Sequence, residues 1–192
     1  MDPKLSMDIQ QTLNSDIAMI LDSLIDINKE YDEQLNAINT TQQWANIARN
    51  YHSNKNQSLF GIVQGGKHKE LREKSATDMM TIDFDGYAIG GLAIGETPEE
   101  RKEIVNFTVE MLPKDKLRYV MGLGDIEGML ELIELGVDIF DCVWPARLAR
   151  HGKIINKGKF LNLKNSKYKK DTDPLVVGCR CFVCLNFSKA YL

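Results

Sequence analysis

The sequence of 192 residues predicts an α/β fold, which we interpret as part of a (β/α)8, or TIM, barrel. Short runs that are apolar on both faces recur along the first 141 residues, as expected of buried parallel strands. Each run ends in glycine or a polar residue, and most are followed by a segment with helical spacing, the crossover that parallel strands require. We count about five such units, whereas a complete barrel has eight strands. An open, doubly wound sheet is the alternative that this pattern leaves open.

The expected strands all have an apolar body and a C-terminal glycine, amide or carboxylate. In a barrel the C-terminal ends of the strands form the rim that carries the active-site residues. The five strands are expected within residues 16–22, 58–66, 84–91, 117–122 and 137–141.

The expected helices are read from apolar spacing and from start signals. The clearest start is Thr97-Pro98-Glu99-Glu100, which offers an N-cap, a proline in the first turn and a glutamate that can complete a capping box. A second helix is expected to be capped by Thr40 or Thr41. The full set lies near residues 7–13, from 40 or 41 to 51, and at 67–81, 97–112 and 126–135.

After residue 141 the repeat stops. Residues 153–163 alternate around an Asn-Lys-Gly turn and predict a β-hairpin. We therefore divide the chain into a partial barrel over residues 1–150 and a basic, cysteine-containing segment over residues 151–192.

The composition, 43% hydrophobic and 27% charged, is that of a globular domain and argues against a disordered chain. No apolar run approaches the roughly 20 residues that span a bilayer, and no signal peptide opens the chain. We expect a cytoplasmic protein without a membrane segment.

Charge is distributed unevenly along the chain. Residues 142–192 hold eleven Lys and Arg against two Asp, a net charge of +9, whereas residues 1–141 hold 13 against 25, a net charge of −12. The basic segment predicts an anionic or nucleic-acid partner, with a solvated basic hairpin as the alternative.

Three of the four cysteines, Cys179, Cys181 and Cys184, form a Cys-x-Cys-x-x-Cys cluster. In a cytoplasmic chain this spacing favours metal ligation by thiolates over disulfides. Cys142 lies in an apolar run and is interpreted as a small buried residue.

The stretch FDCVWPARLARHG (residues 140–152) resembles the nucleophile and wobble-recognition motif of the tRNA-guanine transglycosylases. Six further stretches match this family in its own order, so the resemblance covers essentially the whole chain. They are GIVQG (61–65), GYAIGGLAIGE (86–96), YVMGLG (119–124), NSKYKKDTDPL (165–175), CRCFVC (179–184) and SKAYL (188–192).

The resemblance implies exchange of guanine at the anticodon wobble position of tRNA for a 7-deazaguanine, a step of queuosine biosynthesis. Asp141 is implied as the catalytic nucleophile, forming a covalent aspartyl-ribosyl intermediate by the double displacement that retaining glycosidases also use. Its charge and position alone favour the alternative that Asp141 is a strand-terminal residue that caps the next turn; the flanking motif is what favours the nucleophile.

The resemblance also implies a base pocket. Asp22 would accept hydrogen bonds from the pyrimidine-ring N–H groups, Gln64 would meet the ring carbonyl, and Gly91 would donate its backbone N–H to that carbonyl, with Leu92 beside it.

Tyr119 and Met121 would sandwich the base by stacking, although either residue type in a strand is more commonly part of a core. Ile94 stands where eukaryotic relatives have glycine. This bulk favours 7-aminomethyl-7-deazaguanine over queuine as the incoming base.

Arg147 and Arg150 match family positions that contact the anticodon loop, where guanidinium groups suit unstacked bases and phosphates. A glycine-containing loop after residue 121 matches another RNA-contacting segment, but Asp125 stands there where relatives commonly carry Lys. Ala146 replaces the commoner Thr, and Trp144 a smaller apolar residue. The remaining implied RNA contacts are Gly122, Gly124, Gly128, Ala146, Leu148 and Ala149.

By the same resemblance, Cys179, Cys181 and Cys184 ligate a structural Zn²⁺, whose fourth ligand is a histidine beyond residue 192. A second catalytic aspartate lies ahead of residue 1 in the family, so we expect the chain alone to be inactive. Intact relatives form homodimers through the zinc-bearing region. The alternative is a non-catalytic RNA-binding or partner subunit, or the inactive product of a shortened gene.

Overall fold

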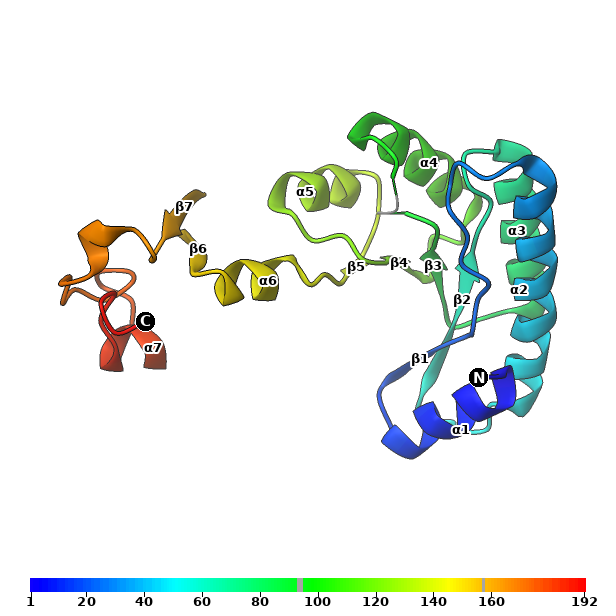
Figure 1. Cartoon of the computed structure of the whole chain (residues 1–192). Helices are drawn as coiled ribbons and strands as arrows, with labels where there is room; N and C mark the ends of the chain where they lie inside the picture. The colour runs from blue at the N-terminus through cyan, green and yellow to red at the C-terminus, as the bar shows by residue number, and fades with distance from the viewer. Residues whose placement is uncertain (93–94, 157) are drawn as a thin grey trace. The chain divides into compact units, whose positions relative to one another are not determined.

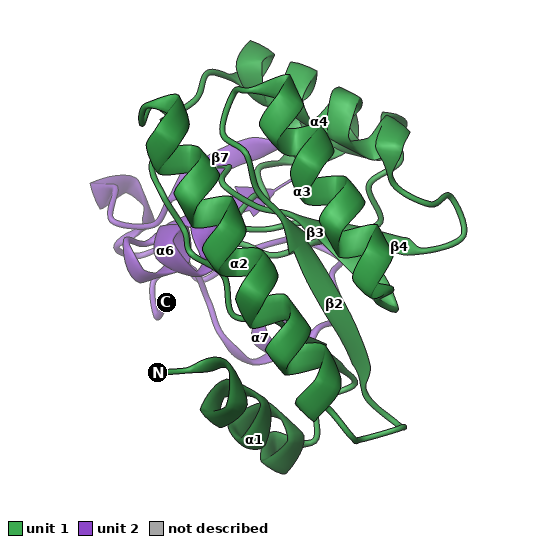
Figure 2. Ribbon diagram, turned by 90° about the vertical axis from the view of Figure 1, so that its right-hand side faces the viewer, with its two compact units in different colours: residues 1–142 green, residues 143–192 purple. Residues whose placement is uncertain are grey.

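A computed structural model describes residues 1–92, 95–156 and 158–192. The chain divides into two compact units, residues 1–142 and 143–192, which are coloured separately in Figure 2. Each unit is described by itself below.

The first unit contains one parallel sheet whose five strands stand in sequence order (Figure 1). A doubly wound sheet reverses its strand order at a switch point, whereas a barrel adds each strand beside the last. The observed order therefore excludes the doubly wound alternative and fits a partial barrel. The strands are β1 (Ile17–Met19), β2 (Ser58–Val63), β3 (Gly86–Ile89), β4 (Leu117–Val120) and β5 (Ile139–Phe140), each parallel to the next.

Helices connect successive strands, and one further helix, α1 (Pro3–Leu13), precedes β1. Neighbouring connecting helices pack on one another, and Figure 2 shows α2, α3 and α4 side by side across one face of the sheet. These connections are α2 (Tyr31–Tyr51), α3 (Lys69–Ile82), α4 (Pro98–Met111) and α5 (Ile126–Glu134).

Two predicted helix starts had opposite outcomes. The capping box of α4 is confirmed, because the Glu100 N–H donates to Thr97 Oγ1 over 3.2 Å and the Thr97 N–H donates to Glu100 Oε2 over 2.8 Å. The predicted cap at Thr40 or Thr41 is wrong, because α2 begins at Tyr31. Thr41 is instead buried in mid-helix, where its hydroxyl donates to the Ala37 carbonyl and accepts the Ser23 N–H.

The hydrophobic core of the first unit lies along the sheet and its covering helices. Two glycines in the strands make room for aromatic rings: a Cβ on Gly61 would lie 2.6 Å from the Phe84 ring, and one on Gly86 would collide with the Phe60 ring. Both phenylalanines are fully buried. The apolar strands of the sequence therefore correspond to a sheet with side chains packed on both faces.

The outer edge of β1 is occupied by a side chain. The amide of Gln10 in α1 donates from Nε2 to the Met19 carbonyl over 2.9 Å and accepts the Met19 N–H at Oε1 over 2.8 Å. This pair of hydrogen bonds is the one that a neighbouring strand would make.

The second unit begins with a short helix, α6 (Trp144–Arg150). The predicted hairpin follows and is confirmed, with β6 (Lys153–Asn156) antiparallel to β7 (Lys159–Asn162). Lys157, in its turn, lies outside the described residues. A 3-10 turn (Ser166–Tyr168) and α7 (Phe182–Asn186) complete the unit. Within the described part of residues 143–192, no residue is fully buried.

In neither unit does a described helix have the length and apolar character needed to cross a membrane.

Candidate active site and metal centre

The predicted base-pocket residues and the predicted nucleophile lie at the carboxyl ends of the five strands. Asp22 follows β1, Gln64 follows β2 and Gly91 follows β3, while Tyr119 is near the end of β4 and Asp141 follows β5. Because all five strands are parallel, these ends form one edge of the sheet. The topology thus places on one edge residues that are spread over 120 positions of sequence.

Gln64 and Asp22 form a direct polar pair. Gln64 is 2% exposed, and its Nε2 donates to Asp22 Oδ2 over 2.5 Å. The Gln64 backbone N–H donates to Ser75 Oγ in α3, which fixes the residue at the strand end. Burial raises the pKa of the Asp22 carboxyl, and the hydrogen bond from Gln64 opposes that shift. The pair presents an amide and a carboxylate, which together can read donors and acceptors on a purine edge.

Gly91 lies against this pair. Its φ of +70° is in the left-handed region, and a Cβ there would lie 2.8 Å from Gln64 Oε1. A larger residue would therefore be strained and would also press on the glutamine amide. Leu92 is buried as part of the core. Ile94, which the base-preference prediction depends on, lies outside the described residues.

Arg72 in α3 supports the pocket and was missed by the sequence analysis. Its fully buried guanidinium donates from Nε to the Gly66 carbonyl over 3.0 Å and from Nη1 to the Val63 carbonyl over 3.4 Å. These carbonyls flank the Gln64 segment. Burial lowers the pKa of Arg72 to about 10, and the negative charge of Glu96 opposes that shift. The available signal was helical spacing, since Arg72 shares the inward face of α3 with buried Leu71 and Ser75.

Asp141 is held by two donors from the β4 end. The Tyr119 hydroxyl donates to Asp141 Oδ1 over 2.6 Å, and the Gly122 N–H donates to the same oxygen over 2.8 Å. Burial and the bond to Asp141 raise the pKa of the Tyr119 phenol above its ordinary value, so this group remains a donor at neutral pH. Neither bond uses Oδ2. The carboxylate is exposed, so it is both oriented and accessible.

Tyr119 thus has a contact that the sequence analysis did not anticipate, since its hydroxyl bonds the carboxylate. Stacking of its ring, and of the half-buried Met121, on a base stays a prediction.

The loop after β4 is closely packed. A Cβ on Gly124 would collide with the Cys142 sulfur, and Gly122 has a φ of +76°. Asp125, which replaces the Lys expected from the family, is the N-cap of α5 and accepts the Gly128 N–H over 2.8 Å. The other predicted RNA contacts belong to α6 in the second unit, where Ala146, Arg147, Ala149 and Arg150 are exposed and Leu148 is half-buried.

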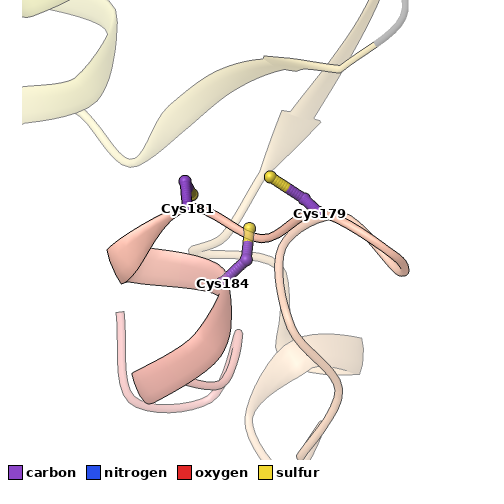
Figure 3. A group of neighbouring side chains, drawn as sticks. All are labelled: Cys179, Cys181 and Cys184. Carbon is purple, nitrogen blue, oxygen red and sulfur yellow. The ribbon is translucent and has the colours of Figure 1, made fainter.

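Three thiols converge at the start of α7 (Figure 3). The sulfur atoms of Cys179, Cys181 and Cys184 all lie within 4.8 Å of one another. Thiolates on a tetrahedral Zn²⁺ are separated by roughly 3.8 Å, given Zn–S bonds of about 2.3 Å. The Cys184 backbone N–H, followed by the Cys179 thiol, lowers the pKa of Cys181. The pKa of Cys184 is raised, because burial and the two neighbouring thiols outweigh its backbone hydrogen bond at Val176. The cluster is a potential metal site that supplies three ligands of the four in a structural zinc centre.

Comparison with known proteins agrees with this arrangement. The family described as "Queuine tRNA-ribosyltransferase" has a sequence model that matches residues 1–192. This chain belongs to the queuine tRNA-ribosyltransferase family. The resemblance drawn from the seven motifs is therefore confirmed, and the queuine tRNA-ribosyltransferases are transferases.

Several queuine tRNA-ribosyltransferases are similar to the chain along its length. Those of Bacillus subtilis and Photobacterium profundum are 42% and 43% identical to it over 191 and 194 residues, and that of Actinobacillus pleuropneumoniae serotype 3 is 45% identical over 192. The matches cover 99–100% of this chain but only 50–52% of those relatives. The chain thus spans about half the length of the curated relatives it matches.

Proposed function

We propose that this chain carries the base pocket and nucleophile of a tRNA-guanine transglycosylase that acts at the wobble position of the tRNA anticodon loop. The observation that carries the proposal is the pair of hydrogen bonds from Tyr119 and Gly122 to Asp141 Oδ1. They hold an exposed carboxylate in a fixed orientation on the same sheet edge as Gln64 and Asp22. A residue whose role was to cap the following turn would accept hydrogen bonds from that turn instead.

The reaction proceeds as a double displacement at the ribose. An oxygen of Asp141 attacks C1′ of the wobble nucleotide, the C1′–N9 bond breaks, and its electron pair leaves with guanine, which takes up a proton. The incoming 7-deazaguanine loses the proton from its ring nitrogen and attacks C1′, releasing the Asp141 carboxylate. Asp22 and Gln64 hold the base by its pyrimidine edge, and the Gly91 N–H donates to the ring carbonyl.

Zinc would have a structural role, with Cys179, Cys181 and Cys184 as three of its four ligands. The anticodon loop is bound by the 122–128 loop and by residues 146–150. We further propose that the incoming base is 7-aminomethyl-7-deazaguanine, and that intact forms are cytoplasmic homodimers.

The experiment uses a chimaera in which this chain replaces the matching half of the Bacillus subtilis relative. We expect the chimaera to incorporate labelled guanine into tRNA, and Asp141→Asn to abolish incorporation. Asp115→Asn serves as the matched control, because this exposed carboxylate precedes β4 and so lies at the opposite end of the strands from Asp141. Normal exchange by the Asp141→Asn chimaera would refute the nucleophile assignment.

Two further measurements complete this test. The 192-residue chain alone is expected to show no exchange, because it spans about half the length of its relatives, and loss of a single general acid–base group already costs about 100-fold or more. A preference of the chimaera for queuine over 7-aminomethyl-7-deazaguanine would contradict the proposed substrate. The competing function, non-catalytic RNA binding, is favoured only by the basic charge of residues 142–192 and predicts an inactive chimaera.

A further inference from the structure

The second unit contains a small cleft with an aromatic wall. It is lined by Trp144 and Leu148 of α6, Lys153 of β6, and Phe160 and Asn162 of β7. The two rings meet edge to face, with centroids 5.9 Å apart and planes at 86°. Phe160 is nevertheless 59% exposed. An aromatic face that is open to solvent in this way offers a stacking surface.

The charge around this cleft favours a polyanionic occupant. Residues 143–192 carry a net charge of +9, since Val143 onward contains the same eleven Lys and Arg and two Asp as the segment starting at Cys142. Arg147 and Arg150 are exposed on the helix that supplies Trp144 and Leu148, and Lys153 itself lines the cleft. Exposed aromatic rings within a basic surface are the combination that proteins use to bind unpaired nucleotides.

We propose that the cleft lined by Trp144 and Phe160 binds one unpaired nucleobase of the RNA loop, separately from the base exchanged at Asp141. The inference rests on the proposed function and specifies how its RNA is held. The base stacks on the exposed aromatic surface, while Lys153 offers a donor and Asn162 an amide to its edge. Because every base has a π-face, the site selects unpaired over paired RNA rather than one sequence.

The first test uses fluorescence of the 192-residue chain. Trp44→Phe leaves Trp144 as its single tryptophan. Two RNAs of equal charge are titrated at constant salt: a 17-nucleotide hairpin with a seven-nucleotide loop, and a fully paired duplex with the same number of phosphates. We expect the hairpin to quench Trp144 fluorescence to a saturating value and the duplex to leave it nearly unchanged. Equal quenching by both RNAs would overturn the proposal.

The second test measures affinity. Trp144→Leu and Phe160→Leu keep an apolar side chain but remove the stacking surface, so each should weaken hairpin binding by about 5- to 20-fold, as expected for one stacked base. Duplex binding should be unchanged, as should the salt dependence of hairpin binding, because no phosphate contact is lost. Trp144→Phe should restore most of the affinity. Tyr51→Leu, which removes an exposed ring from the first unit, is the matched control and should have no effect.

These outcomes distinguish a failure of the cleft proposal from a failure of the proposed reaction at Asp141. Unchanged hairpin affinity in both leucine variants, or an equal loss for hairpin and duplex, would overturn the cleft and leave the function of Asp141 untouched. Complete absence of RNA binding by the chain would overturn the cleft, whereas the function proposed for Asp141 is decided by exchange in the chimaera. Loss of exchange in the Asp141→Asn chimaera is independent of either result.

Discussion

The two units of the chain are stabilised by different means. The first unit buries a continuous set of aliphatic and aromatic side chains along its sheet, whereas no described residue of the second unit is fully buried. A segment of about 50 residues with so little burial needs another source of stability, and small domains commonly obtain it from metal sites. The difference indicates that the first unit is stabilised by packing of its core. Metal binding by the thiol cluster is the candidate source of stability for the second unit.

Removal of metal should have the largest effect, and it should be confined to the second unit. For the zinc-loaded chain, we expect chelation to increase amide hydrogen exchange across residues 153–189 by about 100-fold or more, because metal binding to such sites supplies folding free energy. Amides of β2 and β3 should be unaffected. Cys179→Ser should reproduce the result without chelator. Unchanged protection of the second unit would show that it is ordered without metal and would remove the contrast.

A core substitution should have the converse effect. Phe84 is fully buried and contacts Tyr87 edge to face, with ring centroids 6.4 Å apart. Phe84→Ala should lower the free energy of unfolding of the first unit by about 3–5 kcal/mol, because it leaves a cavity. Phe160→Ala, at an exposed ring of the second unit, should cost under about 1 kcal/mol. Chemical denaturation of both variants would measure this, and equal losses would contradict the comparison.

Arg72 tests whether polar interactions also stabilise the packed unit. Arg72→Met leaves the Val63 and Gly66 carbonyls without their guanidinium donor, and we expect a loss of about 1–3 kcal/mol in the free energy of unfolding. Lys102→Met, at a half-exposed position of α4, is the matched control and should change stability by less than about 0.5 kcal/mol. A stabilised Arg72→Met variant would show that the cost of burying the charge exceeds the value of its hydrogen bonds.

Asp22 should produce the smallest effect, and one that depends on pH. Burial raises its pKa above the ordinary 3.8, so the folded chain binds this proton more tightly than the unfolded chain. The resulting stabilisation is complete below the ordinary pKa and is lost as pH rises through the folded-state value. Asp22→Asn should therefore increase stability slightly at pH 7, and the increase should vanish in acid. Thermal unfolding from pH 3 to pH 7 measures it, and a pH-independent difference would exclude this origin.

The sequence was most informative about secondary structure that is determined by residues close together in the chain. All five strands, the α4 capping box and the hairpin follow from apolar runs, turn residues and spacing, and the structure confirms them. The order of the strands across the sheet required the structure, because the same pattern of parallel strands also fits a doubly wound sheet.

Features that depend on contacts across the fold were not predictable. Helix α2 begins after Glu30, which makes no side-chain cap, while the better capping residue Thr41 is held in mid-helix by Ser23 from another segment. For the site, the motifs indicated Asp141 and Gln64, but not that Tyr119 would donate to the carboxylate or that Arg72 would be buried behind Gln64. The bond from Tyr119 joins residues 22 positions apart, and those from Arg72 reach carbonyls six and nine positions away. Their geometry exists only once strands and helices have packed together.

The Gln10 amide at the border of β1 has a consequence for self-association. An unpaired strand edge is a template on which other chains can extend a sheet, and natural proteins obstruct such edges. The Gln10 amide makes the two hydrogen bonds that a peptide group of a neighbouring strand would make, and so occupies the backbone N–H and carbonyl of Met19. Any strand arriving there, from the same polypeptide or another, must first displace α1's side chain and give up two hydrogen bonds. The Gln10 amide therefore protects this edge of β1 from intermolecular β-sheet extension, and it can be displaced only at the cost of those two hydrogen bonds.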